Sequence, residues 1–176
     1  MSKAVLISIR PKWCEKIVNG NKTIEVRKTR PKMNTPFKCY IYCTLPKYPH
    51  EDFIATNYPR PQFYGGGKVV GEFTCDQIYE LETKTRGGSY YAKNEDQSTT
   101  NFIAQQSCLT LKDIHDYLHA QKGYGWHITD LRIYDAPREL SEFTGLRNTR
   151  FGAEPYDIKR APQSWCYVED VHDEHC

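Results

Sequence analysis

The sequence predicts an α+β fold that is mostly β, built as a small barrel with peripheral helices. Two observations predict this class. Short apolar stretches with strand-like alternation recur along the chain, and only two or three short segments show a helical pattern. At 176 residues the chain is long enough for a sizeable core. We expect a single domain over residues 1–168, followed by an acidic tail, residues 169–176, that frays.

The first quarter of the chain alternates between strand and helix patterns. Ala4–Ile9 is an apolar stretch that predicts a strand. Pro11 suits the first turn of a helix, where a missing N–H is harmless, and Gly20 suits the cap at its C-terminus. Two further strands are expected over Thr23–Lys28 and Phe37–Thr44.

The middle of the chain is expected to be rich in loops. Residues 45–67 contain four prolines and end in three consecutive glycines, which predicts a loop. The next stretch, Lys68–Leu81, is predicted to be one long strand, in which Gly71 marks a bulge or a close backbone approach. Residues 83–100 are polar, and we expect them to form an exposed excursion.

The second half of the chain predicts one helix and two strand regions. A capping-box-like start at Thr110 predicts a helix that runs to about Gln121. Strands are expected over Gly123–Tyr134, ended by Pro137, and over Trp165–Val168. The expected buried face of the helix consists of Leu111, Ile114, Tyr117 and Leu118.

Positive charge is concentrated near the N-terminus. Residues 1–47 hold eleven Lys or Arg against two acidic residues, whereas the remainder of the chain has a balance of −7. A segment with this excess attracts phosphates if folding keeps its charges together. The alternative is that folding mixes these charges with the acidic remainder, which would leave no basic patch.

The chain shows no secretory signal and no apolar run of membrane-spanning length. Its seven cysteines therefore fit a reduced, cytoplasmic protein better than a disulfide scaffold. We expect Cys39 and Cys43 to be buried thiols. We also expect no membrane partner and no cofactor, and the sequence does not indicate an oligomeric state.

Two groups of histidines are candidates for metal ligands. His115 and His119 have the spacing that lets two imidazoles share a metal, but no third ligand is evident. The tail residues His172, His175 and Cys176 lack a partner pair of cysteines. The sequence therefore predicts no metal site.

The charged stretch Gly20–Lys28 contains the strongest functional signal. Side chains alternate between the two faces of a strand, so Ile24 and Val26 are expected to point into a core. Glu25 and Arg27 would then point together to the opposite face, as would Thr23. A charged face of this kind is either a solvated edge or one wall of a polar site that also includes Lys22.

Further polar and aromatic residues at strand positions extend this candidate site: Glu72, Trp126, His127 and Trp165. Aromatic rings stack on bases and polar groups read base edges, so a set of this kind suits a base pocket. The alternative is that the Trp residues fill the core and that Glu25 and Arg27 form a surface ion pair.

The stretch Gly20–Arg27 (GNKTIEVR) resembles the G-x-K-x-x-E-x-R signature of the ASCH domain family, a branch of the PUA-like superfamily. Four further segments, in the same order, resemble members from low-GC bacteria and their phages: Ser8–Pro11, Val70–Phe73, Gly123–Ile128 and Pro162–Val168. The resemblance spans residues 3 to about 168. It implies a PUA-like β-barrel with a cleft lined by the signature residues.

The resemblance implies two classes of function. PUA-like relatives bind RNA or modified bases, which would place a base against Trp126 or Trp165. Some small bacterial members are metal-independent amidohydrolases that deacetylate acetylcytidine with a Lys, a Thr and a Glu. Here the Lys corresponds to Lys22 and the Glu to Glu72, while Glu25 occupies the position of the Thr.

Another member is a ribonuclease, and for that activity His127 is the first candidate for acid–base catalysis. The sequence thus predicts a protein that binds RNA or a modified nucleoside. The expected binding residues are Lys22, Glu25, Arg27, Trp126, His127 and Trp165. If the protein is an enzyme, the expected catalytic residues are Lys22, Glu72 and Glu25.

Overall fold

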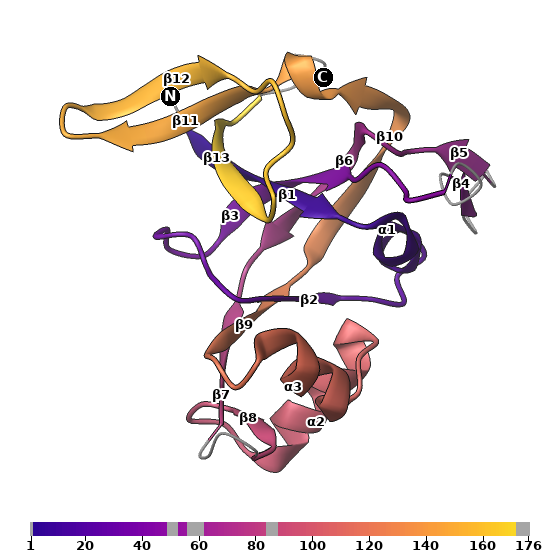
Figure 1. Cartoon of the computed structure of the whole chain (residues 1–176), viewed down its shortest axis with the longest axis vertical. Coiled ribbons are helices and arrows are strands. Elements are labelled where there is room, and N and C mark those ends of the chain that lie inside the picture. The colour runs from indigo at the N-terminus through magenta and orange to yellow at the C-terminus, as the bar shows by residue number, and fades with distance from the viewer. Residues whose placement is uncertain (1, 49–52, 56–61, 84–87, 172–176) are drawn as a thin grey trace. The chain divides into compact units, whose positions relative to one another are not determined.

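A computed structural model describes residues 2–48, 53–55, 62–83 and 88–171 of the chain (Figure 1). The chain forms two compact units. The first consists of Met1–Asn19, Phe37–Thr74 and Asp130–Cys176, and the second of Gly20–Pro36 and Cys75–Thr129. The expectation of one domain over residues 1–168 stays a prediction.

The first unit is built on a seven-stranded sheet in the order β10-β6-β3-β1-β13-β11-β12. β1 lies at its centre, parallel to β3 and antiparallel to β13. Helix α1 (Pro11–Val18) and a short 3-10 helix (Leu140–Glu142) accompany it, as does the small antiparallel pair of β4 (Phe53–Ala55) and β5 (Gln62–Tyr64). The strands of the large sheet are β1 Lys3–Ile9, β3 Phe37–Cys43, β6 Lys68–Cys75, β10 Thr129–Glu139, β11 Thr144–Thr149, β12 Gly152–Asp157 and β13 Trp165–Glu169.

The apolar sequence of β1 explains its central position. Six consecutive residues of this strand are buried, as expected for a strand that is covered on both faces. α1 follows with Pro11 in its first turn, where the missing N–H needs no partner. Gly20, two residues beyond the helix, has a φ of +72°, a left-handed conformation that suits glycine.

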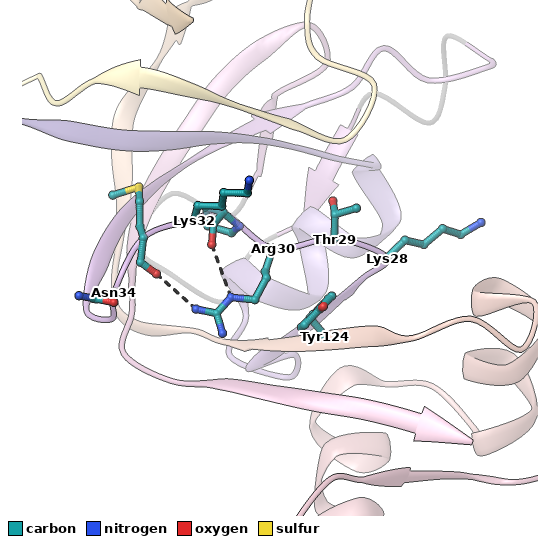
Figure 2. Close-up of a pocket in the computed structure, with 8 residues that line it drawn as sticks. Lys28, Thr29, Arg30, Lys32, Asn34 and Tyr124 are labelled. Carbon is teal, nitrogen blue, oxygen red and sulfur yellow. Dashed lines mark hydrogen bonds between the residues drawn. The ribbon is translucent and has the colours of Figure 1, made fainter. Parts of the chain in front are cut away.

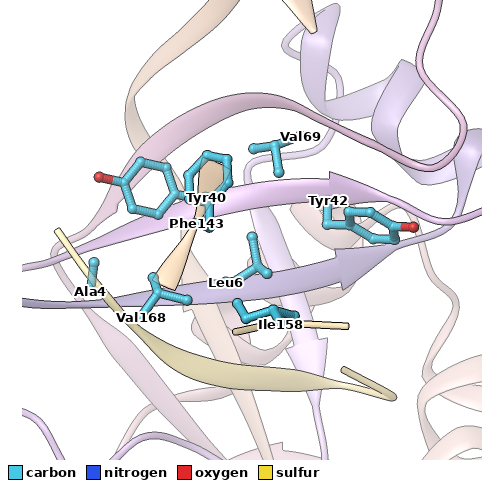
Figure 3. Packing of buried hydrophobic residues seen from close by; sticks show 8 residues of the cluster. All are labelled: Ala4, Leu6, Tyr40, Tyr42, Val69, Phe143, Ile158 and Val168. Carbon is cyan, nitrogen blue, oxygen red and sulfur yellow. The ribbon is translucent and has the colours of Figure 1, made fainter. Parts of the chain in front are cut away.

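One core cluster of the first unit packs on one face of this sheet (Figure 3). The rings of Tyr40 and Phe143 meet edge to face with their centroids 5.0 Å apart. The Tyr40 hydroxyl donates to Asp170 Oδ1 at 2.6 Å and accepts from the Val171 amide at 2.9 Å. Asp170 and Val171 are therefore held against β3, whereas residues 172–176 lie outside the described part. The cluster consists of Ala4, Leu6, Tyr40, Tyr42, Val69, Phe143, Ile158 and Val168.

The second unit is a four-stranded sheet in the order β2-β9-β7-β8 with two helices. Both helices contact the sheet, α2 at β2 and β8 and α3 at β8. Their apolar side chains complete a second core made of Ile24, Val26, Leu81, Tyr90, Ala92, Ile103, Ile114 and Leu118. The elements are β2 Ile24–Arg27, β7 Ile78–Thr83, β8 Tyr90–Ala92, α2 Gln97–Ser107, α3 Leu111–Leu118 and β9 Gly123–His127.

The mostly β fold with three α-helices confirms the predicted class, and most expected elements are present. The capping box at Thr110 and Asp113 is confirmed, because each residue bonds the backbone N–H of the other. Cys39 and Cys43 are buried, as expected. The expected close approach at Gly71 is also confirmed, since a Cβ there would lie 2.5 Å from the carbonyl oxygen of Arg132.

Several element boundaries were predicted wrongly. Lys68–Leu81 forms two strands, β6 and β7, which belong to different sheets. α3 ends at Leu118 because His119 and Ala120 have left-handed φ values of 52° and 60°. Within this helix Tyr117 is exposed rather than buried. Pro137 does not end β10, since β10 is an edge strand of the large sheet, where a missing N–H is tolerated.

The segment expected to be an exposed excursion is also folded in part. It contains β8, in which Tyr90 and Ala92 are buried, and the start of α2. Residues 84–87 lie outside the described part. The loop expected over residues 45–67 contains β4 and β5, and the hairpin of β11 and β12 was not predicted. No helix in the described residues is both long and apolar enough to cross a bilayer.

Candidate functional site

The register of β2 and β9 determines which side chains share a face in the second unit. Glu25 lies opposite Trp126, and Arg27 lies opposite Tyr124. Directly opposed residues of an antiparallel pair project to the same side, so these four side chains share one face. Ile24 and Val26 lie on the other face and join the core. The predicted alternation of this strand is confirmed.

The charged residues of this stretch form a buried ion network. Lys22 Nζ lies 3.1 Å from Glu25 Oε2, and Arg27 Nη2 lies 2.9 Å from Glu25 Oε1. The side chains of Lys22, Glu25 and Arg27 are 2%, 8% and 9% exposed. The alternative of a surface ion pair is therefore wrong. The network holds two cations and one anion, so it carries a net positive charge.

Lys22 is held by acceptors from several parts of the second unit. Besides Glu25, its ammonium group donates to the carbonyl oxygens of Ile24 at 2.9 Å and of Ser107 at 2.8 Å. An ammonium group has three N–H donors, so each can meet one acceptor. Ser107 is the last residue of α2, where carbonyl groups lack partners within the helix. Lys22 therefore ties β2 to the C-terminus of α2.

The two cations keep Glu25 ionised. Burial alone would raise the pKa of this carboxyl group, but the charges and hydrogen bonds of Lys22 and Arg27 outweigh it and lower the pKa. Glu25 is thus an anion at neutral pH whose oxygens are both engaged by positive charges.

A basic pocket begins where β2 ends (Figure 2). It has a volume of about 530 Å³, and three of its lining side chains are cationic while none is acidic. Arg30 is held in place by its donation to the carbonyl oxygens of Pro31 at 3.5 Å and Met33 at 3.3 Å. The ring of Tyr124, the β9 partner of Arg27, forms part of its wall. The lining residues are Lys28, Thr29, Arg30, Pro31, Lys32, Met33, Asn34 and Tyr124.

The residues of this pocket were not predicted individually from the sequence. The signal that could have found them is the excess of positive charge over residues 1–47. Lys28, Arg30 and Lys32 all belong to that segment. Folding brings these three residues to the lining of one pocket, which includes no acidic residue.

Two predicted aromatic residues of β9 lie on opposite faces of the sheet. Trp126 shares the face of Glu25 and is fully buried. His127 lies opposite Ile24, and its Nδ1 is 2.7 Å from Asp76 Oδ1. The structure therefore does not bring Trp126 and His127 to one surface, and it gives His127 a carboxylate partner that was not predicted.

Glu72 and Trp165 belong to the first unit. The hydroxyl of Tyr134 donates to Glu72 Oε2 at 2.6 Å, and Lys38 Nζ lies 3.9 Å from Glu72 Oε1. Burial, with a further contribution from the Glu72 hydrogen bond, raises the pKa of Tyr134. The ring of Trp165 meets that of Tyr167 edge to face, with the centroids 5.3 Å apart.

The histidines that are candidates for metal ligands have other interaction partners. His115 Nδ1 is 3.6 Å from Asp116 Oδ1, and its ring meets that of Tyr90 edge to face. His119 caps the C-terminus of α3. Within the described residues, no group of three or more His, Cys, Asp or Glu side chains is placed to hold a metal ion. His172, His175 and Cys176 lie outside that part of the chain.

These features give a mostly β, α+β fold, and it is similar to the fold of a solved ASCH structure. The crystal structure of ASCH from Zymomonas mobilis matches with a TM-score of 0.58 and 18% sequence identity, over 94% of this chain and 87% of that chain. A Ser-to-Ala variant of that protein matches with a TM-score of 0.55 and 18% identity, over 94% and 88% of the two chains. A Tyr-to-Phe variant matches with a TM-score of 0.51 and 17% identity, over 96% and 91%.

At these identities the similarity concerns the fold. No family model matches the chain, and no curated protein matches it. These three structures come from one organism, and they do not support the expected likeness to members from low-GC bacteria and their phages.

Proposed function

We propose that this chain is an ASCH domain protein that binds RNA or a modified nucleoside, and that the basic pocket holds a phosphate group of the ligand. The observation that carries the proposal is the charge of the pocket, which has three cationic side chains and no acidic one in its lining. The ASCH-type fold is consistent with it.

The side chains of the pocket suit a nucleotide. Lys28 and Lys32 are exposed, whereas Arg30 is held by two backbone carbonyls. Lysine and arginine supply the electrostatic part of nucleic-acid binding. Tyr124 is half-buried at the pocket wall, so part of its ring is open to a base. Stacking on an aromatic ring is the usual way in which proteins hold an unpaired base.

The buried ion network stabilises the strand that leads into the pocket segment. Lys22, Glu25 and Arg27 fix β2, and the pocket segment starts at the next residue, Lys28. We therefore propose that these three residues position the binding loop and contribute a net positive charge. Trp126 is fully buried, so we assign the stacking role to Tyr124.

Fluorescence anisotropy with a labelled single-stranded oligoribonucleotide tests the proposal. We expect binding that weakens as salt concentration rises, because displaced counterions drive part of the association. Replacing both Lys28 and Lys32 by Gln should weaken binding and reduce its logarithmic salt slope by roughly one unit for each phosphate-binding lysine that is removed. Lys112→Gln is the matched control, since Lys112 is an exposed lysine of the same unit that pairs with Asp116.

Two results would count against RNA or nucleoside binding. One is the absence of salt-dependent binding to oligoribonucleotides together with no binding to a panel of modified nucleosides. The other is equal affinity of the Lys28 and Lys32 double variant and the Lys112→Gln control.

A second candidate is a metal-independent amidohydrolase that acts on an N-acylated cytidine. The observation that favours it is the contact of 3.1 Å between Lys22 and the ionised Glu25. In this proposal Glu25 activates water and passes a proton to the leaving amine, and Lys22 polarises the amide carbonyl. Lys22 would have to exchange one of its acceptors for the substrate, which makes this the weaker candidate.

The change in ultraviolet absorbance during incubation with acetylcytidine tests the hydrolase. No turnover by the intact protein, or undiminished turnover in a folded Lys22→Ala variant, excludes it.

For a ribonuclease, the favourable observation is the pairing of His127 with Asp76 at 2.7 Å. Cleavage of labelled RNA that survives unchanged in His127→Asn excludes that role.

A further inference from the structure

A second pocket of the second unit lies between α2 and the start of β7. Its volume is about 350 Å³. Ser98, Thr99 and Phe102 line it from α2, where their spacing places them on one helical face. Glu95, which precedes the N-cap residue of this helix, also lines the pocket, as do Gln77 and Tyr79.

The hydroxyl and carboxylate groups of this pocket present acceptors, and the Gln77 side-chain amide is the one lining side chain that adds N–H donors. The hydroxyls of Ser98 and Thr99 donate to Asp96 Oδ1 at 2.7 and 3.0 Å, so their oxygens retain lone pairs for a ligand. The hydroxyl of Tyr79 donates to Gln77 Oε1 at 3.1 Å and likewise keeps an acceptor. Glu95 adds a carboxylate, and none of the lining residues is Lys or Arg.

The pocket also contains two aromatic rings. Tyr79 belongs to β7 and Phe102 to α2, and Phe102 is 42% exposed. Aromatic faces attract cations through their quadrupole, and the Glu95 carboxylate adds a Coulombic attraction. Burial, together with the negative charges of Glu95 and Asp76, raises the pKa of Tyr79. That direction is the one expected in a negative local potential.

The partial positive charge at the N-terminus of α2 opposes the negative potential of the pocket but does not reverse its sign. A helix N-terminus by itself favours an anion. Here that end is already occupied, because Asp96 accepts the Thr99 amide at 2.8 Å. Glu95 then adds a second negative charge next to the first.

We propose that this pocket binds an organic cation, an alkylammonium or guanidinium group. Such a group supplies N–H donors for the hydroxyl and carboxylate acceptors, and its charge faces the two rings. The site is separate from the basic pocket, with which it shares no lining residue. It stands whether or not the chain binds RNA.

Chemical shifts of backbone and side-chain amides test the proposal on the full chain. Titration with butylammonium and with methylguanidinium should move the Gln77 side-chain amide and the amides of Thr99 and Phe102 in a saturable way. Inorganic phosphate should leave these signals in place. The same titration with Gly-Lys-Gly and Gly-Arg-Gly peptides distinguishes a free organic cation from a side chain presented by a peptide.

Variants identify which groups hold the cation. Phe102→Ala should weaken binding roughly 2- to 5-fold by removing one ring. Glu95→Gln should weaken it by a similar factor without changing the shape of the pocket. The matched control is Glu82→Gln, the same change at a carboxylate of β7 that does not line the pocket. Saturation by phosphate instead of the cations, or equal cation affinity in Glu95→Gln and Glu82→Gln, would overturn the proposal.

Discussion

Arg27 Nη2 lies 2.9 Å from Glu25 Oε1 on a strand whose four residues are all buried. An ion pair in this setting has lost most of its hydration, and the loss is offset only if both charges remain satisfied. Glu25 is the shared partner, because it also binds Lys22. Its carboxylate is therefore the member of the network on which the other two charges depend.

Replacing Glu25 should destabilise the protein strongly. Glu25→Ala leaves the buried charges of Lys22 and Arg27 without their anion, and removal of one partner from a buried pair typically costs about 3–5 kcal/mol. Chemical denaturation monitored by circular dichroism measures the free energy of unfolding. Glu154→Ala is the control, because Glu154 forms an exposed pair with Arg147 and should change stability by less than about 1 kcal/mol.

Stability should also fall in acid because of Glu25. Its pKa in the folded state lies below the ordinary value of 4.5, so the unfolded chain takes up a proton at higher pH than the folded chain. The contribution is complete above the unfolded pKa and is lost as pH falls through the folded pKa. The free energy of unfolding from pH 6 downward measures this. A Glu25→Gln variant should show a shallower decline below about pH 4.5, and an unchanged slope would contradict the assignment.

Two glycines should respond to alanine for different reasons. At Gly71 the new Cβ would lie 2.5 Å from the Arg132 carbonyl oxygen, so adjacent strands must move apart, at a cost of about 1–3 kcal/mol. At Gly20 nothing lies within 4 Å of the Cβ, but φ is +72°. There the cost is only that of the left-handed backbone, about 1–2 kcal/mol. Thermal unfolding of both variants measures the difference.

The capping box of α3 should contribute measurably to the free energy of unfolding. Thr110 Oγ1 accepts the Asp113 amide at 3.0 Å, and Asp113 Oδ2 accepts the Thr110 amide at 2.8 Å. Thr110→Ala should cost about 1 kcal/mol of the free energy of unfolding. Lys112→Ala, an exposed change in the same turn, should be nearly neutral. Equal effects of the two variants would show that the cap contributes nothing.

Tyr124 provides the sharpest test of stacking in the basic pocket. Loss of its ring in Tyr124→Leu should weaken binding of a single-stranded oligoribonucleotide by about 1–3 kcal/mol. Tyr124→Phe keeps the ring and should bind like the intact protein. Anisotropy titration at constant salt concentration measures both affinities, and a matching loss in the two variants would assign the effect to the hydroxyl instead.

The sequence predicted correctly those helices and strands that have a strong local pattern. The unbroken apolar run of β1, the alternation in β2 and the capping box of α3 are all properties of neighbouring residues. α2 was missed because its sequence is polar and only Thr100, Ile103 and Ser107 are buried. β11 and β12 were missed because they contain Gly, Pro, Asn and Asp, which are rare in strands.

For the candidate site, the sequence by itself determined which residues of the charged stretch share a face. A strand has a period of two, so Glu25 and Arg27 had to lie together, opposite Ile24 and Val26. It also placed Lys28, Arg30 and Lys32 in a segment with an excess of positive charge.

Only the tertiary structure decided what these residues meet. The acceptor that Lys22 finds at Ser107 lies 85 positions away along the chain, and Tyr124 joins the basic pocket because β9 pairs with β2 in one register. The second pocket, lined by α2 residues and Tyr79, likewise depends on how α2 packs in the second unit. The physical reason is that a local pattern determines the face on which a side chain lies, whereas its partner depends on which distant segment is folded against that face.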